Sequence, residues 1–177
     1  MKRRVLILTA ASLLLVLLVG QLNHYLALWQ MHVWCGGLFV AFVALRLGYR
    51  TGAASVFAAG LLLDAGVPAA FGTQGFLFLA AHAVIFTVRA RAPRDETIIG
   101  VMVALFANLG LFLALCFLRM DSTMDPAQSW MRAFADLLIS QIVLALIAPW
   151  FFAVQTRLLE ANGTSLRATT RTSRFAL

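Results

Sequence analysis

The sequence predicts an all-α integral membrane protein, a bundle of six transmembrane helices. Of its 177 residues, 62% are hydrophobic and only 12% are charged, and the mean hydropathy is +0.91. A chain of this composition has lipid as its main solvent. Apolar runs follow one another almost end to end, so we expect residues 1–155 to form one transmembrane helical domain with no separate soluble domain.

The length of each apolar run gives the expected span, since about 20 apolar residues are needed to cross a bilayer. The first run follows the basic residues 2–4 and lacks a convincing cleavage site, so we expect a span rather than a secretory signal. The third run reaches only about 24 Å as a helix, so it ends early or continues as a re-entrant turn. The expected spans are residues 5–22, 31–47, 51–66, 72–90, 97–118 and 130–154.

The basic residues support this topology, because cytoplasmic loops of membrane proteins carry the excess of lysine and arginine. With six spans, all but two of the 14 basic residues fall on the same side as both termini. Arg119, Arg132 and Asp64 fall on the other side. We therefore expect a multi-pass protein of a bacterial inner membrane with cytoplasmic termini. The net charge of +7 follows from this topology, and no nucleic-acid partner is expected.

The last segment, residues 156–177, is expected to be a basic, disordered cytoplasmic tail. It is rich in threonine, serine, alanine and arginine and is too poor in large apolar residues to build a core. Its four arginines are expected to lie against the anionic lipids of the inner leaflet. Membrane lipids are therefore predicted partners of this segment.

One acidic residue, Asp64, lies inside an otherwise apolar region and is flanked by Gly60, Gly66, Pro68 and Gly72. A carboxylate at membrane depth is costly unless protein, a polar partner or water shelters it. Glycine and proline break regular helix, and irregular backbone at that depth is tolerated only where protein or a wet cavity surrounds it. The sequence thus predicts a short helix that ends in a packed turn, with these residues binding a partner or fixing the fold.

Three polar side chains are expected at a similar depth in the last three spans: His82, Asn108 and Gln141. They could line a polar pocket for a ligand, or they could make hydrogen bonds between helices, which are common in membrane bundles. We favour the hydrogen bonds. Arg132 and Asp136 lie one helical turn apart and are spaced for an ion pair.

An enzyme is not expected from this sequence. We find no Ser, His and Asp set with plausible proximity, no paired carboxylates, no phosphate-binding glycine loop and no metal-ligand spacing of Cys and His. The sequence therefore predicts a non-enzymatic protein with no cofactor and no metal.

The spacing of Gly60, Asp64 and Gly72 resembles the signature of the MreD family of rod shape-determining membrane proteins. The chain is also similar to that family in size, in its basic N-terminus, in the turn at residues 46–52 and in its basic C-terminal end. The resemblance implies an inner-membrane component of the bacterial elongation machinery that scaffolds cell-wall (peptidoglycan) synthesis. The partners that it implies are an MreC-like single-span protein, the RodA/penicillin-binding-protein synthase and MreB.

A second interpretation starts from architecture, because the MreD family is similar to the substrate-binding subunits of energy-coupling-factor vitamin transporters. Those subunits are six-span proteins of about this size. A transporter subunit needs an outward-opening pocket, which His82, Asn108 and Gln141 could line, with Asp64 and Trp130 above them. Few specific donors lie on that outward surface, so the elongation machinery is the preferred interpretation and vitamin binding is the alternative.

Overall fold

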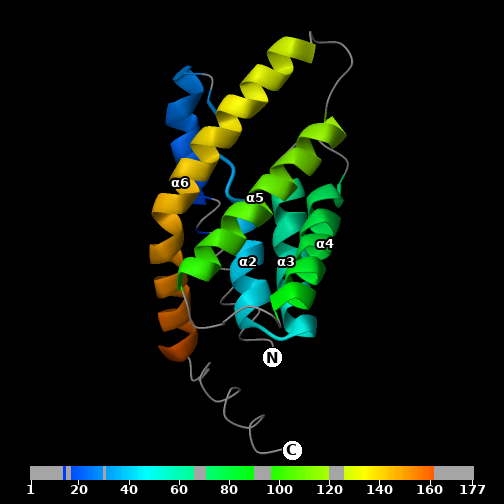
Figure 1. The fold of residues 1–177 in the computed structure, drawn as a ribbon, viewed down its shortest axis with the longest axis vertical. Coiled ribbons are helices and arrows are strands. Elements are labelled where there is room, and N and C mark those ends of the chain that lie inside the picture. The colour runs from blue at the N-terminus through cyan, green and yellow to red at the C-terminus, as the bar shows by residue number, and fades with distance from the viewer. Residues whose placement is uncertain are drawn as a thin grey trace, which may run out of the picture.

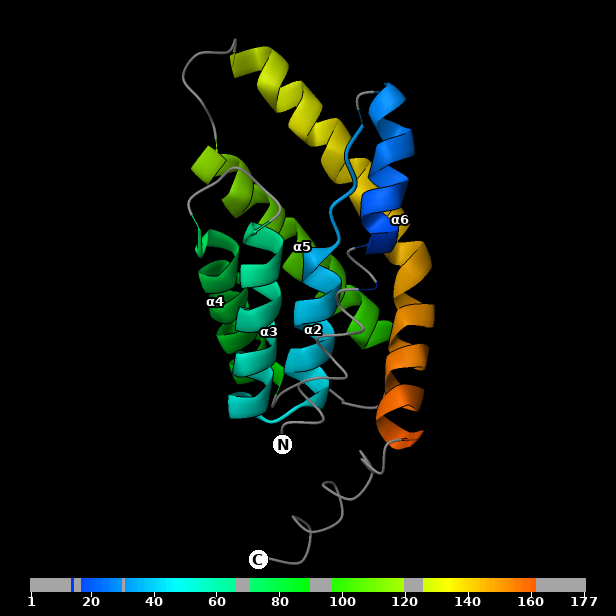
Figure 2. The same cartoon turned by 180° about the vertical axis from the view of Figure 1, so that it is seen from behind.

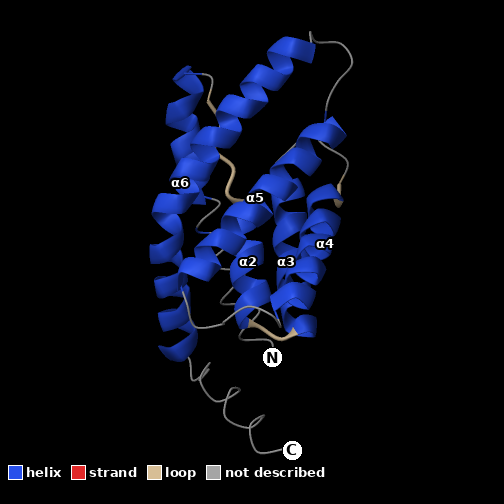
Figure 3. Cartoon of the chain, viewed as in Figure 1, coloured by secondary structure: helices blue, strands red, loops and turns tan. Residues whose placement is uncertain are grey.

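The computed structural model describes residues 14, 17–29, 31–65, 71–89, 97–119 and 126–161. In these ranges the chain is helical apart from short links and turns, and it contains no strand (Figure 3). The prediction of an all-helical fold is therefore confirmed for the described residues. Residues 17–26 form a helix that is followed by η1 (Ala27–Trp29), α2 (Gly36–Arg46), α3 (Tyr49–Asp64), α4 (Thr73–Val88), α5 (Thr97–Arg119) and α6 (Pro126–Ala161).

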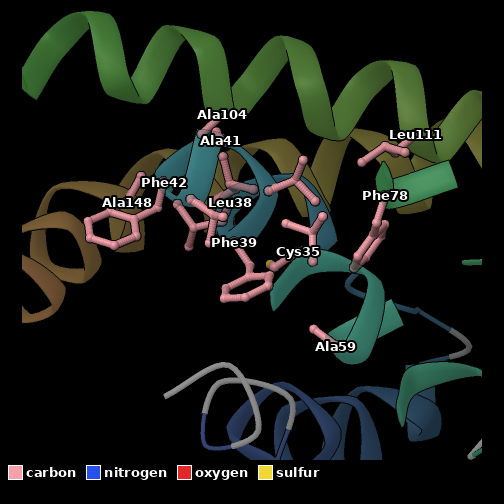
Figure 4. Packing of buried hydrophobic residues seen from close by; sticks show 14 of the residues in the cluster. Cys35, Leu38, Phe39, Ala41, Phe42, Ala59, Phe78, Ala104, Leu111 and Ala148 are labelled. Atoms are coloured by element: carbon pink, nitrogen blue, oxygen red, sulfur yellow. The ribbon is translucent and has the colours of Figure 1, made fainter. Parts of the chain in front are cut away.

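Helix α2 lies at the centre of the bundle (Figures 1 and 2). It is apolar on all sides, and every residue from Gly37 to Ala44 is buried, as expected of a helix surrounded by others. α3, α4, α5 and α6 all pack against it. Figure 4 shows the resulting core, in which side chains of α2 meet residues of the other four helices: Ala59, Phe78, Ala104, Leu111 and Ala148.

α3 and α4 form an antiparallel hairpin, the most extensive helix pair of the fold. Its close approach depends on Gly60 of α3, which lies against the backbone of Gly75 in α4. A Cβ placed on Gly60 would lie 2.5 Å from the Cα atom of Gly75, so the two backbones are in direct contact. Small residues at a helix interface permit this approach and the dispersion energy that comes with it.

α5 and α6 are the two described helices that are long and apolar enough to cross a membrane, by length and composition. The qualifying stretches are Ile98–Leu118 and Ala127–Leu158. α2 has 11 residues, and α3 and α4 have 16 each. A run of apolar residues therefore gave the position of each described helix, but not a full membrane-spanning length for the shorter ones.

The helices differ from the expected spans at several bounds. Residues 31–35 of the expected second span are not helical, and α2 begins only at Gly36. The first helix continues past its expected end at residue 22 to residue 26 and then into η1. α6 extends through Ala161, so the first residues of the expected tail are helical. Residues 162–177 lie outside the described part of the chain.

Candidate functional site

Asp64, the last residue of α3, accepts hydrogen bonds from the backbone at the start of α4. Its Oδ2 atom accepts from the amides of Gly72 at 3.0 Å, Gln74 at 3.0 Å and Gly75 at 3.3 Å. The Gln74 amide also lies 3.2 Å from Oδ1. The side chain is only 3% exposed. The carboxylate thus caps the N-terminus of a helix that begins nine residues further along the chain.

These contacts explain how a charge is buried here. The first amides of a helix have no acceptor within the helix, and the positive end of the helix dipole favours an anion. Hydrogen bonds to an ionised acceptor are among the stronger ones in proteins. The N-cap residue Gly72 has no capping side chain of its own, so Asp64 supplies the acceptor that this helix end needs.

Gly60 and Gly72, the two glycines of the resemblance, stabilise the same connection between α3 and α4 in different ways. Gly72 has a φ of +99°, a left-handed conformation that costs other residues about 1–2 kcal/mol. Gly60 lies one helical turn before Asp64 and gives α3 its backbone contact with α4 at Gly75. Gly66 and Pro68, which we expected in this turn, lie outside the described residues.

His82, Asn108 and Gln141 each contact a different part of the bundle, and their common depth stays a prediction. Asn108 Oδ1 accepts from the Gly37 amide of α2 at 3.2 Å, and Gln141 Nε2 donates to the Leu105 carbonyl of α5 at 3.2 Å. Both contacts are hydrogen bonds between helices.

His82 is fully buried in α4 and packs against Gly52, Tyr49 and Phe86. Its two ring nitrogens have no hydrogen-bond partner among the described residues. Its ring nitrogen Nε2 lies so close to Gly52 that a Cβ there would collide with it. The packing around His82 therefore leaves no space for a ligand on that side of the ring.

A set of side chains that was not predicted from the sequence holds the non-helical segment 31–35 in place. Asn23 binds both backbone groups of Val33, with Nδ2 donating to the carbonyl at 2.8 Å and Oδ1 accepting from the amide at 2.7 Å. Asp136 of α6 accepts from the His32 amide at 2.9 Å, and Ser140 Oγ accepts from the Trp34 amide at 3.0 Å.

Asp136 thus has a backbone partner far away in the sequence, and its expected ion pair with Arg132 stays a prediction. These side chains replace the hydrogen bonds that a continuous helix would have made. The polar positions 136 and 140, one turn apart on α6, were the only signal of this role.

Arg89 caps the other end of α2, a role that its expected place among the cytoplasmic charges did not indicate. One guanidinium nitrogen donates to the carbonyls of Ala44 and Leu47, each at 2.6 Å. The guanidinium carbon lies 3.6 Å from the centre of the Phe86 ring. The last carbonyls of a helix need such donors, so charged and amide side chains stabilise the ends of both α2 and α4.

The described residues contain no group of three or more His, Cys, Asp or Glu side chains placed to hold a metal ion. The polar side chains described above stabilise the ends of helices. Gly60, Asp64 and Gly72 form the densest group of residues with this role. Comparison with protein-family models, curated proteins and solved structures found no match.

Proposed function

We propose that this chain is a multi-pass protein of a bacterial inner membrane, with six spans and both termini in the cytoplasm. The support is the two long apolar helices α5 and α6 together with the position of the charges. Arg46, Arg50, Arg89 and Arg157 lie at the end of the bundle where α2, α4 and α6 finish and α3 begins. Asp64 lies at the opposite end of α3. Clustered arginines at one end are typical of the cytoplasmic side.

Reporter fusions test this topology. Green fluorescent protein fused after Leu177 is expected to fluoresce, and alkaline phosphatase at the same position is expected to be inactive. Alkaline phosphatase inserted after residue 122, between α5 and α6, is expected to be active because that connection faces the exterior. Active phosphatase at the C-terminus, or recovery of the chain in the soluble fraction, would contradict the topology.

Within that membrane, we propose that the protein is a non-enzymatic component of the cell-elongation machinery that sets rod shape, like the MreD family that it resembles. One observation carries this proposal. The three residues of the resemblance all stabilise one structural unit, the connection between α3 and α4. Gly60 makes the helix contact, Asp64 caps α4, and Gly72 adopts the left-handed conformation of the turn. A spacing that arose by chance would not be expected to give its three residues linked roles in one unit.

The unit would act by fixing a docking surface rather than by direct contact of the carboxylate. Asp64 is buried and its hydrogen bonds stay inside the chain. The apolar side chains near this end of the hairpin are exposed instead: Leu62 by 45%, Phe71 by 72% and Phe76 by 66%. The proposed partner is the transmembrane segment of an MreC-like single-span protein. Through it the chain would join the RodA/penicillin-binding-protein synthase and MreB.

Depletion in a rod-shaped bacterium that encodes the protein tests the function. Cells are expected to round up as the protein is lost, because an elongation machinery without its scaffold no longer directs wall growth along the cylinder. Cell width and length are measured by microscopy, and re-expression of the unaltered chain is expected to restore rods. An unchanged outline together with a new vitamin requirement would overturn the proposal in favour of a vitamin-transporter subunit.

A further inference from the structure

We propose that the link between α2 and α3 binds the phosphate of an anionic phospholipid through Arg46 and Arg50. The link consists of Leu47 and Gly48, and the two arginines lie on either side of it. Arg50 is exposed and Arg46 is half-buried. This inference rests on the membrane topology proposed above, in which the link faces the inner leaflet.

The backbone that carries the two arginines is held in place by the interior of the bundle. Arg89 donates to the carbonyls of Ala44 and Leu47, and the Leu47 amide donates to the Val43 carbonyl at 3.0 Å. Arg89 therefore occupies the carbonyls next to Arg46 and neutralises that end of α2. Because the link is ordered before a ligand arrives, less conformational entropy is lost when two guanidinium groups close on one phosphate.

The charge at this end of the bundle selects an anion. Arg46, Arg50, Arg89 and Arg157 outnumber the one acidic residue of the described helices at this end, Glu160 in the last turn of α6. Asp64 and Asp136 lie near the opposite end, at the end of α3 and in the first turns of α6. Arginine is suited to phosphate because its planar group can donate two parallel hydrogen bonds to two oxygens. Basic sites between helices on the cytoplasmic side are typical places for anionic lipid headgroups.

The neighbouring surface fits a lipid rather than free phosphate. Tyr49 follows the link directly, is 48% exposed and has its ring 5.1 Å from that of Phe86. Tyrosine prefers the level of the headgroups in a bilayer. Val84 and Val88 of α4 are 63% and 59% exposed near the same end of the bundle. A lipid bound at Arg46 and Arg50 would have apolar surface of this kind available to its acyl chains.

Lipid retention by the full-length protein in detergent tests the proposal. Phosphatidylglycerol and phosphatidylcholine with identical acyl chains are offered together, and the bound lipids are counted by native mass spectrometry. Phosphatidylglycerol is expected to be retained about thirtyfold more than phosphatidylcholine, in line with two arginines near an anionic headgroup. R46Q/R50Q is expected to remove most of this preference, and the remainder is attributed to the arginines of residues 156–177. R132Q, at the opposite end of the bundle, is expected to keep it.

A second variant separates headgroup binding from membrane topology. R46K/R50K keeps both positive charges, and therefore the signal for orientation, but loses the paired donors of the guanidinium groups. We expect correct insertion and at least half of the lipid preference lost. Equal retention of the two lipids by the unaltered protein, an unchanged preference in R46K/R50K, or displacement of the lipid by millimolar inorganic phosphate would each overturn the proposal. Failure of the proposed function would instead appear in the topology and depletion experiments.

Discussion

Replacing Asp64 with alanine is expected to lower the free energy of unfolding by about 3–5 kcal/mol, because buried amides lose their acceptor. The carboxylate accepts from three backbone amides at the start of α4. Alanine cannot accept any of these bonds, and the buried site gives water little access to replace them. Thermal unfolding of the purified protein in detergent, followed by size-exclusion chromatography, measures the loss.

Two further variants show whether the cap itself is responsible. Asp64→Asn keeps one carbonyl acceptor in a side chain of the same shape, so its loss of stability is expected to be intermediate. Asp136→Ala removes a carboxylate whose Oδ1 accepts from one amide in an exposed hydrogen bond, and a loss near 1 kcal/mol or less is expected, about the worth of one ordinary hydrogen bond. Equal stability of the two alanine variants would show that Asp64 does not cap α4.

Replacing Gly60 with alanine is expected to cost about 1–3 kcal/mol, because the new methyl group meets backbone rather than a movable side chain. The added Cβ would lie 2.5 Å from the Gly75 Cα atom and 2.7 Å from its amide nitrogen. The helices α3 and α4 must separate to admit it. The same thermal unfolding measurement reports the cost.

Gly110 of α5 is the matched control for this substitution. A Cβ on Gly110 meets no heavy atom within 4 Å. Gly110→Ala is therefore expected to leave stability unchanged or to raise it by up to about 1 kcal/mol, since alanine favours helix more than glycine does. A loss of stability at Gly110 as large as that at Gly60 would mean that helix contact is not the reason for the effect.

That protein surrounds Asp64 could be predicted from the sequence. Which groups hydrogen-bond its carboxylate could not. A charge in an apolar region needs protein around it, and the nearby glycines indicated a turn. The partners, however, are backbone amides, and every residue has one. Only the reversal of the chain brings the amides of Gly72, Gln74 and Gly75 to the carboxylate, and hydropathy carries no information about that reversal.

The non-helical segment 31–35 could not be predicted for a related reason. Hydropathy predicts that this segment is the start of a helix, because the segment continues the apolar run of α2. Its real conformation depends on Asn23, Asp136 and Ser140, which replace helical hydrogen bonds. The last two are more than 100 positions away in the sequence, so local periodicity could not reveal them.

The double attachment of α3 to α4 has a mechanical consequence. The glycine contact joins the two helices along their sides, and the cap joins the end of one to the start of the other. With both contacts in place, sliding of one helix along the other at this end would break the cap and the backbone contact together. A force that a neighbouring protein exerts on either helix at this end would therefore be shared by both helices.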